Sequence, residues 1–257
     1  MELDGCPAEA HEVAALGLHN YGHFTTMVVE QGHVRGLSLH LRRLLTDCRT
    51  LFAADLDPDR LRGLIRQACT EPAVIARVTI FAPDLDLASP SREVEPHVLV
   101  TTTSPPARDL PALRVRTVRY RRDLPQVKHT GLFATVLLRR RAQLDGFHDV
   151  VFVDDRGRIC EGATWNIGFV EQDRVVWPAA DCLPGVTMQQ LREANPLEMV
   201  DSTVDLEAAR HMRCAFATNA ANGIRAIASI DDVTYAAGDE AIVRLRQAYL
   251  AVLGEPL

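Results

Sequence analysis

The sequence has no uninterrupted apolar stretch long enough to cross a bilayer, which excludes an ordinary membrane-spanning protein. Its first ten residues, MELDGCPAEA, are acidic and lack the basic and then apolar pattern of a signal peptide. The formal charge of −6 argues against a general affinity for nucleic acid. We therefore expect a cytoplasmic globular protein that binds neither a membrane nor a nucleic acid.

Closely spaced cysteines are also lacking. The six cysteines are far apart and form no C-x-x-C pair, whereas zinc sites and disulfide frameworks normally show patterned spacing. The nine histidines are dispersed along the chain. We expect reduced, mostly buried thiols and no metal site.

Length and composition are those of an ordinary globular protein. The chain has 257 residues, of which 47% are hydrophobic and 24% charged, enough for one large domain or two moderate ones. The polar, proline-rich stretch TTTSPPARDLPA at residues 101–112 separates two regions of regular pattern. We expect a small N-terminal α/β domain over residues 1–104, a linker over 105–112 and a larger domain over 113–257.

Hydrophobic periodicity predicts the elements of each half. In the first half we expect strands at residues 25–30, 33–38, 73–81 and 97–102, and helices at 39–52 and 59–70. In the second half we expect strands at 113–120, 150–154, 160–170, 174–177, 214–217 and 224–230, and helices at 131–145, 188–194, 205–209 and 239–253. Many strands joined by tight turns favour a mixed sheet or partial barrel, so the expected fold class is α+β.

Two segments of the second half are suited to binding a phosphate. Gly185 lets the backbone of LPGVT, residues 183–187, approach a ligand, and Thr187 with Gln190 fits the capping box that opens a helix. Amide groups at a helix start attract an anion. The second segment, TNAANG at residues 218–223, has small residues that leave its amides open. Each segment taken alone is better explained as an ordinary helix start or loop.

Lys128 and Glu161 are the most informative pair of residues. A lysine can hold an aldehyde as a Schiff base, and a carboxylate at the far end of a heteroaromatic ring can keep that ring protonated. Arg43, within HLRRL, can give a phosphate the charge-assisted contact that it favours, although a lone arginine on a helix is more often solvated. These residues act together only if the fold brings them to one cofactor.

The ordered set of motifs resembles the class IV, fold-type IV family of enzymes that use pyridoxal 5′-phosphate (PLP). The matching segments are YGHFTTMVVEQGHV, HLRRL, EGATWNIGFV and LPGVT, within a region from about Tyr21 to Ile230. The family includes branched-chain and D-amino-acid aminotransferases, (R)-selective amine transaminases and aminodeoxychorismate lyase. The resemblance implies a small N-terminal domain, a larger mixed-sheet or pseudo-barrel domain that anchors PLP, and a homodimer.

The resemblance also implies a role for each matching residue. Lys128 would hold PLP and carry the proton between substrate and cofactor, and Glu161 would pair with the pyridinium nitrogen. Leu183 would pack on the ring. The phosphate would be bound by a set of six residues: Arg43, Gly185, Val186, Thr187, Asn219 and Ala220.

Three positions depart from the family pattern. Phe133 stands where many family transaminases have a tyrosine beside the phenolic oxygen of PLP. Trp165 stands where an acidic residue often supports that tyrosine, and Met188 replaces a common arginine. We expect a rearranged, more apolar wall near the ring.

Three functions are consistent with these motifs. EGA and LPGVT favour a transaminase, which would move an amino group from an amino acid or amine donor to a 2-oxo acid. FTT and TNA favour aminodeoxychorismate lyase, which releases pyruvate and 4-aminobenzoate; there Thr26 matches a threonine implicated in proton transfer, and an ordinary strand threonine is an equal alternative. The three departures suggest a PLP-binding protein without catalysis. One of Arg119, Arg121 and Arg122 is a candidate for a substrate carboxylate, although surface exposure explains each of them better.

Overall fold

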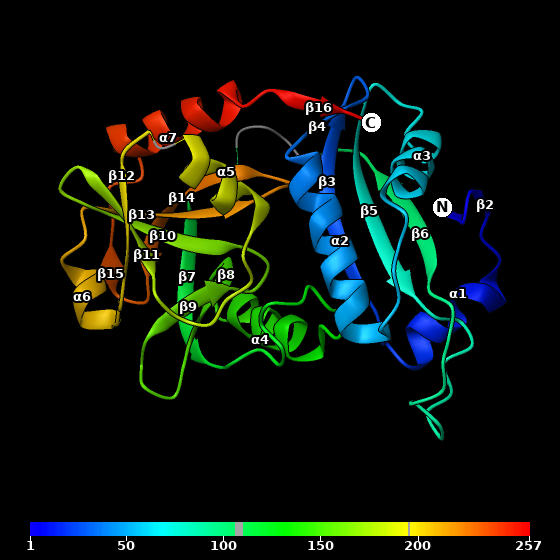
Figure 1. Ribbon diagram of the computed structural model, residues 1–257. Coiled ribbons are helices and arrows are strands. Elements are labelled where there is room, and N and C mark those ends of the chain that lie inside the picture. The colour runs from blue at the N-terminus through cyan, green and yellow to red at the C-terminus, as the bar shows by residue number, and fades with distance from the viewer. Residues whose placement is uncertain (106–109, 195) are drawn as a thin grey trace. The chain divides into compact units, whose positions relative to one another are not determined.

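The computed structural model describes residues 1–105, 110–194 and 196–257, and the chain divides into two compact units (Figure 1). The small unit contains Met1–Pro106, Val127–Gly131 and Gly254–Leu257, and the large unit contains Ala107–Gln126 and Leu132–Leu253. The division expected from sequence placed Lys128 and the last four residues with the larger half, whereas the contacts place them in the small unit. Residues 106–109 of the expected linker lie outside the described residues.

The small unit is a seven-stranded antiparallel sheet in the order β16-β4-β3-β5-β6-β1-β2. Its strands are β1 (Glu2–Leu3), β2 (Cys6–Pro7), β3 (His23–Glu30), β4 (His33–Arg35), β5 (Ala73–Phe81), β6 (His97–Thr103) and β16 (Gly254–Pro256). Its helices are α1 (Ala10–Leu18), α2 (Leu37–Phe52) and α3 (Pro58–Ala68).

One apolar stripe fixes α2 on this sheet. Leu37, Leu41, Leu44 and Cys48 recur at helical spacing and pack with the inward side chains of β3, such as Met27. Side chains alternate along a strand, so the other face of β3 carries Phe24, Thr26 and Val28. The α2 helix therefore covers the face of the sheet that carries Met27, and Phe24 and Thr26 lie on the opposite face.

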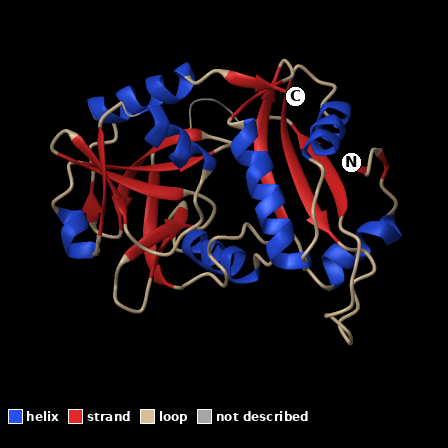
Figure 2. Ribbon diagram, viewed as in Figure 1, coloured by secondary structure: helices blue, strands red, loops and turns tan. Residues whose placement is uncertain are grey.

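The large unit is a nine-stranded mixed sheet in the order β12-β11-β10-β13-β14-β7-β8-β9, with β15 paired to β14. Its strands are β7 (Leu113–Arg119), β8 (Asp149–Val153), β9 (Ile159–Gly162), β10 (Asn166–Glu171), β11 (Arg174–Pro178), β12 (Glu198–Ser202), β13 (Cys214–Asn219), β14 (Gly223–Ile230) and β15 (Val233–Thr234). Its helices are α4 (Phe133–Leu144), α5 (Val186–Ala194), α6 (Leu206–Arg210) and α7 (Glu240–Ala251), shown in blue in Figure 2.

The sheet of the large unit curls around one core. Ile159 of β9, the strand at one end of the order, shares a cluster with Ile167 and Phe169 of β10 and with Ile227 of β14. The β9 strand also approaches β10 and β11. The outer face packs on α5 and α7 through a second cluster that includes Phe216. The expected α+β class with a mixed, barrel-like sheet is confirmed.

The strand expected over residues 160–170 is instead two strands, β9 and β10. The chain reverses between them because Gly162 donates its N–H to the carbonyl of Trp165 over 2.8 Å. The indole covers Gly162 so closely that a Cβ there would lie 2.0 Å from a ring atom. No helix in the described part of the chain has the length and apolarity needed to cross a membrane.

Candidate active site

The candidate site residues fall into two groups, one in each unit. The small unit carries Lys128, Thr26 and Arg43. The large unit carries the other members of the set: Glu161, Leu183, Gly185, Val186, Thr187, Asn219 and Ala220.

Lys128 lies in a five-residue segment, Val127–Gly131, that joins the small unit although the chain on both sides belongs to the large unit. The carbonyl of Lys128 accepts the N–H of Phe24 at 2.9 Å, and its own N–H donates to Oδ2 of Asp47 at 3.1 Å. Thr130 fastens the same segment through its N–H, which donates to the carbonyl of Gly22 at 2.8 Å. The Nζ of Lys128 lies 4.9 Å from the centre of the Phe24 ring.

Thr26 shares this face of β3 with Phe24. It pairs across the sheet with Arg77, whose guanidinium lies 3.7 Å from the centre of the Phe24 ring. Burial lowers the pKa of Arg77 from its usual range, although an arginine stays protonated under ordinary conditions. The face therefore combines an aromatic ring, a hydroxyl and two cationic side chains. Arg77 was not among the residues expected from sequence.

Arg43 belongs to α2, one turn beyond His40. His40 is buried, and its Nδ1 lies 2.7 Å from Oγ1 of Thr25. Burial, with the positive charges of Arg43 and Lys128, lowers the pKa of His40 to about 3, so the ring is neutral at pH 7. Its Nε2 is buried and has no hydrogen-bond partner. Arg43 and Lys128 therefore lie in a cationic neighbourhood that suits an anionic ligand.

Glu161 is buried near the end of β9, and its two oxygens have different partners. Oε1 lies 3.3 Å from Nη1 of Arg122, and Oε2 accepts the N–H of Leu183 at 3.2 Å. The side chains of Arg122 and Glu161 are only 8% and 6% exposed, so this contact is shielded from water. Arg122, a sequence candidate for a substrate carboxylate, instead contacts the acid of the site.

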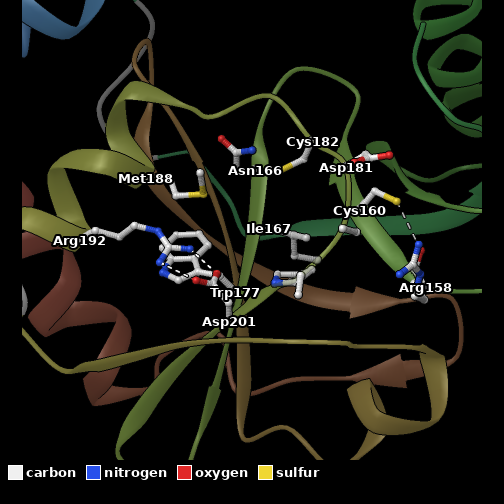
Figure 3. A pocket seen from close by; sticks show the side chains of 13 residues that line it. Arg158, Cys160, Asn166, Ile167, Trp177, Asp181, Cys182, Met188, Arg192 and Asp201 are labelled. Atoms are coloured by element: carbon white, nitrogen blue, oxygen red, sulfur yellow. Dashed lines mark hydrogen bonds and ion pairs between the residues drawn. The ribbon is translucent and has the colours of Figure 1, made fainter. Parts of the chain in front are cut away.

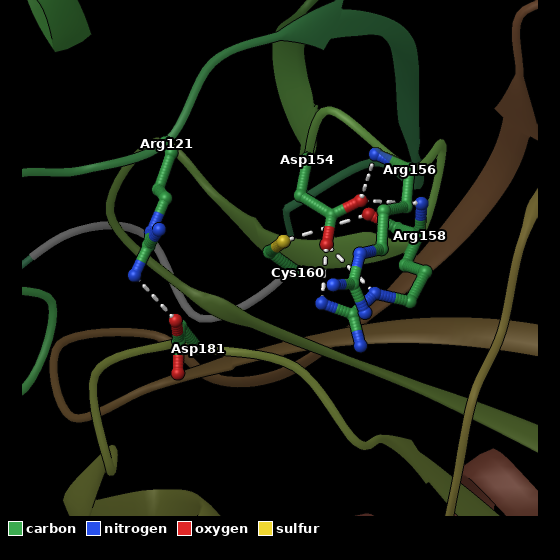
Figure 4. A network of polar contacts seen from close by, with 6 residues as sticks. All are labelled: Arg121, Asp154, Arg156, Arg158, Cys160 and Asp181. Atoms are coloured by element: carbon green, nitrogen blue, oxygen red, sulfur yellow. Dashed lines mark hydrogen bonds and ion pairs between the residues drawn. The ribbon is translucent and has the colours of Figure 1, made fainter.

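A polar network anchors the turn that leads into β9 (Figure 4). The carboxylate of Asp154 accepts the N–H groups of Arg156 and Arg158, each at 2.9 Å, and pairs with the Arg158 guanidinium at 2.6 Å. Arg121 pairs with Asp181 at 2.8 Å on the surface. The network fixes the start of the strand that carries Glu161.

The side chain of Asn166 contacts the loop at residues 183–187 at two positions, Leu183 and Gly185. Nδ2 of Asn166 donates to the carbonyl of Leu183 at 2.7 Å, and a Cβ at Gly185 would lie 2.0 Å from Oδ1 of the same side chain. Gly185 is thus required by close contact rather than by an unusual φ angle. Both ends of Leu183 are fixed, because its N–H is bonded to Glu161.

The expected capping box of Thr187 and Gln190 does not form. The α5 helix begins at Val186, so Thr187 lies inside its first turn and is not the residue that precedes the helix. Oγ1 of Thr187, Oε1 of Gln190 and Oγ1 of Thr218 are all buried without a hydrogen-bond partner.

Buried polar atoms without partners are rare and costly, so the two hydroxyl groups of Thr187 and Thr218 suit a ligand that accepts hydrogen bonds. A phosphate fits this position, because its oxygens accept hydrogen bonds from hydroxyl and amide groups. The turn beside it is shaped by Asn219, whose Oδ1 accepts the N–H of Asn222 at 2.8 Å. Ala220 lies within that turn.

A cavity of about 430 Å³ opens elsewhere in the large unit (Figure 3). Its lining includes Cys160, Asn166, Trp177, Cys182 and Met188. Successive side chains of a strand point to opposite faces. Cys160 lines the cavity, so the cavity lies on the face of β9 opposite to the side chain of Glu161. Burial raises the pKa of the Cys160 thiol to about 11 and that of Cys182 to about 12. These thiols stay protonated at pH 7, and the cavity is distinct from the residues expected to hold PLP.

The three departures from the family pattern have different surroundings. Phe133 is 79% exposed at the start of α4. Trp165 is buried and donates its indole N–H to Oδ2 of Asp149 at 3.1 Å, while Met188 lines the cavity. Trp165 therefore has a structural partner in the core of the large unit.

A family model, amino-transferase class IV, matches residues 22–230. The chain belongs to this family. Class IV aminotransferases depend on PLP, and the family assignment makes this protein a PLP-dependent enzyme. A comparison with curated protein sequences gives no match.

Solved structures show the same fold at low sequence identity. The branched-chain aminotransferase of Thermoproteus uzoniensis is 17% identical with a TM-score of 0.86, over 97% of this chain and 92% of that chain. The 4-amino-4-deoxychorismate lyase of Pseudomonas aeruginosa is 24% identical with a TM-score of 0.80, over 98% of both chains. A hypothetical aminotransferase of Mycobacterium tuberculosis in a PLP-bound form is 18% identical with a TM-score of 0.78, over 96% of this chain and 94% of that chain.

Lys128 is the only lysine in the sequence; the other 27 of the 28 basic residues counted as lysine or arginine are arginines. An amine-directed chemistry on this chain therefore has Lys128 and the N-terminal amine as its only targets.

Asp47, Arg77 and Arg122 were not predicted as supporting residues. Each is a charged residue in a helix, a strand or an arginine-rich run, where the sequence alone favours contact with solvent.

Proposed function

We propose that this protein is a transaminase that moves an amino group from an amino acid or amine donor to a 2-oxo acid, with Lys128 as its catalytic residue. The observation that carries the proposal is that the only lysine of the chain lies in a short segment of its own, fastened to the small unit by backbone hydrogen bonds. Such fastening supports a precise position for Nζ.

The residues of the large unit fit the two ends of PLP. The buried carboxylate of Glu161 would hold a proton on the ring nitrogen, and Leu183 would pack on the ring. The amides of Val186 and Thr187, with Gly185, Asn219 and Ala220, would hold the phosphate, to which Arg43 would add its charge.

PLP supplies an electron sink for the pair left when the α-carbon of the substrate loses its proton. Nζ of Lys128 would take that proton and return it at the other carbon.

We also propose that the protein is a cytoplasmic homodimer. The α4 helix supports a subunit contact, because it exposes Phe133 by 79%, Val136 by 59% and Leu144 by 69%. These apolar side chains recur three and eight residues apart, so they follow one side of the helix. A second copy of the chain would remove them from water.

The sole lysine makes a direct test possible. The purified protein is mixed with PLP and reduced with borohydride, and the modified peptide is identified by mass spectrometry. We expect yellow colour and a stable adduct at Lys128, with both lost in Lys128→Ala. Amino exchange from alanine to several 2-oxo acids then tests transamination. An adduct on the N-terminal amine alone would contradict the proposal.

A lyase is the second candidate, and Thr26 is the observation that favours it. Thr26 lies on the face of β3 that carries Phe24, the ring over which Nζ of Lys128 lies. A hydroxyl on this face could pass a proton to a leaving group. Pyruvate release from aminodeoxychorismate, lost in Thr26→Val but not in Thr25→Val, would support this activity. Capture of PLP with no turnover on either substrate set would leave a binding protein.

A further inference from the structure

The side chain of Asp47 is hydrogen-bonded to the main chain of Lys128. Asp47 is 3% exposed on α2, and its Oδ2 accepts the backbone N–H of Lys128 at 3.1 Å. A carboxylate that accepts an N–H forms a stronger bond than a neutral acceptor does. The two residues are 81 positions apart, so the contact depends on the folded small unit.

The base of this contact is rigid. The α2 helix packs on the sheet through Leu37, Leu41 and Leu44, which are 0%, 5% and 0% exposed. Asp47 lies one turn after Leu44, beside the buried Cys48. A side chain held this way has few alternative positions, and its bond to Lys128 is correspondingly fixed.

The segment that carries Lys128 is short, and hydrogen bonds to the small unit fix its position. It has only five residues, and the chain enters the small unit and leaves it again within them. Backbone bonds hold its carbonyl side, at Lys128 to Phe24, while Asp47 holds the N–H side of the same residue. The two bonds together fix the peptide planes on either side of the Lys128 Cα, from which the amine extends.

We propose that Asp47 is a positioning residue for Lys128, which fixes its main chain so that Nζ meets the aldehyde of the coenzyme in one orientation. The inference rests on the proposed role of Lys128. It makes Asp47 important for how fast the amine captures an aldehyde, beyond any contribution to stability.

The test compares the rate of aldehyde capture in apoprotein variants. Pyridoxal, which lacks the phosphate, is used beside PLP so that phosphate binding does not contribute. Capture joins Nζ to the aldehyde carbon with loss of one water, and the yellow absorbance is followed after rapid mixing. We expect Asp47→Ala to slow capture of both compounds about tenfold, the factor that corresponds to about 1.4 kcal/mol. Asp47→Asn, which keeps an acceptor oxygen, is expected within about threefold of the unmodified protein, a smaller loss than one full hydrogen bond.

Thr130→Val is the matched control. Its Oγ1 donates to the carbonyl of Asn20 at 2.8 Å, so this change also loosens the segment without touching the peptide of Lys128. We expect Thr130→Val to lower the unfolding temperature as much as Asp47→Ala but to leave the capture rate nearly unchanged. Hydrogen exchange at residues 127–131 should rise in Asp47→Ala.

The outcomes separate the two proposals. If the unmodified protein forms no adduct at Lys128, the proposed function fails. If it forms one and Asp47→Ala captures pyridoxal at the same rate, or if Thr130→Val slows capture equally, Asp47 has no positioning role. Folded Asp47→Asn gives a second test if Asp47→Ala does not fold. A loss of capture rate greater than about threefold in this variant would overturn the assigned hydrogen-bond role.

Discussion

Acid should destabilise the small unit through its two buried histidines. His23 and His40 are 0% and 1% exposed, and burial lowers the pKa of each to about 3. In the unfolded chain a histidine has a pKa of about 6.5. As the pH falls below 6.5, the two histidines therefore become protonated in the unfolded state but stay neutral in the folded state. The stabilisation is fully present above pH 6.5 and is lost progressively between pH 6.5 and pH 3.

The magnitude follows from the proton count. Each histidine changes the free energy of unfolding by about 1.4 kcal/mol for each pH unit in this window. Between pH 7.5 and pH 5.0, His40 alone should lower it by about 2 kcal/mol, and the two histidines together by about 4 kcal/mol. These values are a large share of the stability of an ordinary domain.

Urea unfolding of the apoprotein, followed by circular dichroism at pH 7.5, 6.5, 5.5 and 5.0, measures this loss. His40→Asn keeps a polar atom near Nδ1 for Thr25 and removes the titration, so its loss between pH 7.5 and 5.0 should be smaller by about 2 kcal/mol. His11→Asn is the control, because the side chain of His11 is 79% exposed. Equal losses in His40→Asn and the unmodified protein would refute the reasoning.

Two further substitutions test the large unit. Glu161→Gln keeps an acceptor for the N–H of Leu183 but removes the negative charge beside the buried Arg122. Urea unfolding should show that the change destabilises the unit by about 3 kcal/mol. The rate of amino exchange should also fall. Unchanged stability would mean that the contact is dispensable. Gly185→Ala should weaken PLP binding, measured by absorbance titration, and cost about 2 kcal/mol in urea unfolding, because its Cβ would meet Asn166. Gly63→Ala, which has open space in α3, should be neutral or stabilising, and equal effects of the two glycine changes would contradict the close contact.

Local pattern was enough to predict most of the fold. The β5 strand, Ala73–Phe81, was expected with the same bounds because its alternating and β-branched residues are a local signal. The helix expected at 39–52 begins two residues earlier, since Gly36 has a φ of +71° and lets the chain turn directly into α2. By contrast, β16 has three residues and pairs with β4 more than two hundred residues away, so no local pattern marks it.

The site was less predictable than the fold. Motif order singled out Lys128 and Glu161, but the residues that hold them come from distant segments. Asp47 and Arg122 are charged residues whose local sequence resembles that of solvated side chains. Thr187 fits a capping pattern, yet α5 begins two residues too early for the cap to form. These contacts depend on tertiary packing, which spacing along the chain does not encode.

The small unit is built from segments that are far apart in the sequence, and this affects the order in which it can fold. Its first 106 residues are synthesised long before β16, which covers the β4 edge of its sheet. At 5–20 residues per second, a ribosome would take roughly 7 to 30 seconds to go from residue 106 to β16, and β4 would lack that neighbour throughout. Unpaired strand edges invite association with other nascent chains. The growing polypeptide is therefore most vulnerable to misassembly during that interval.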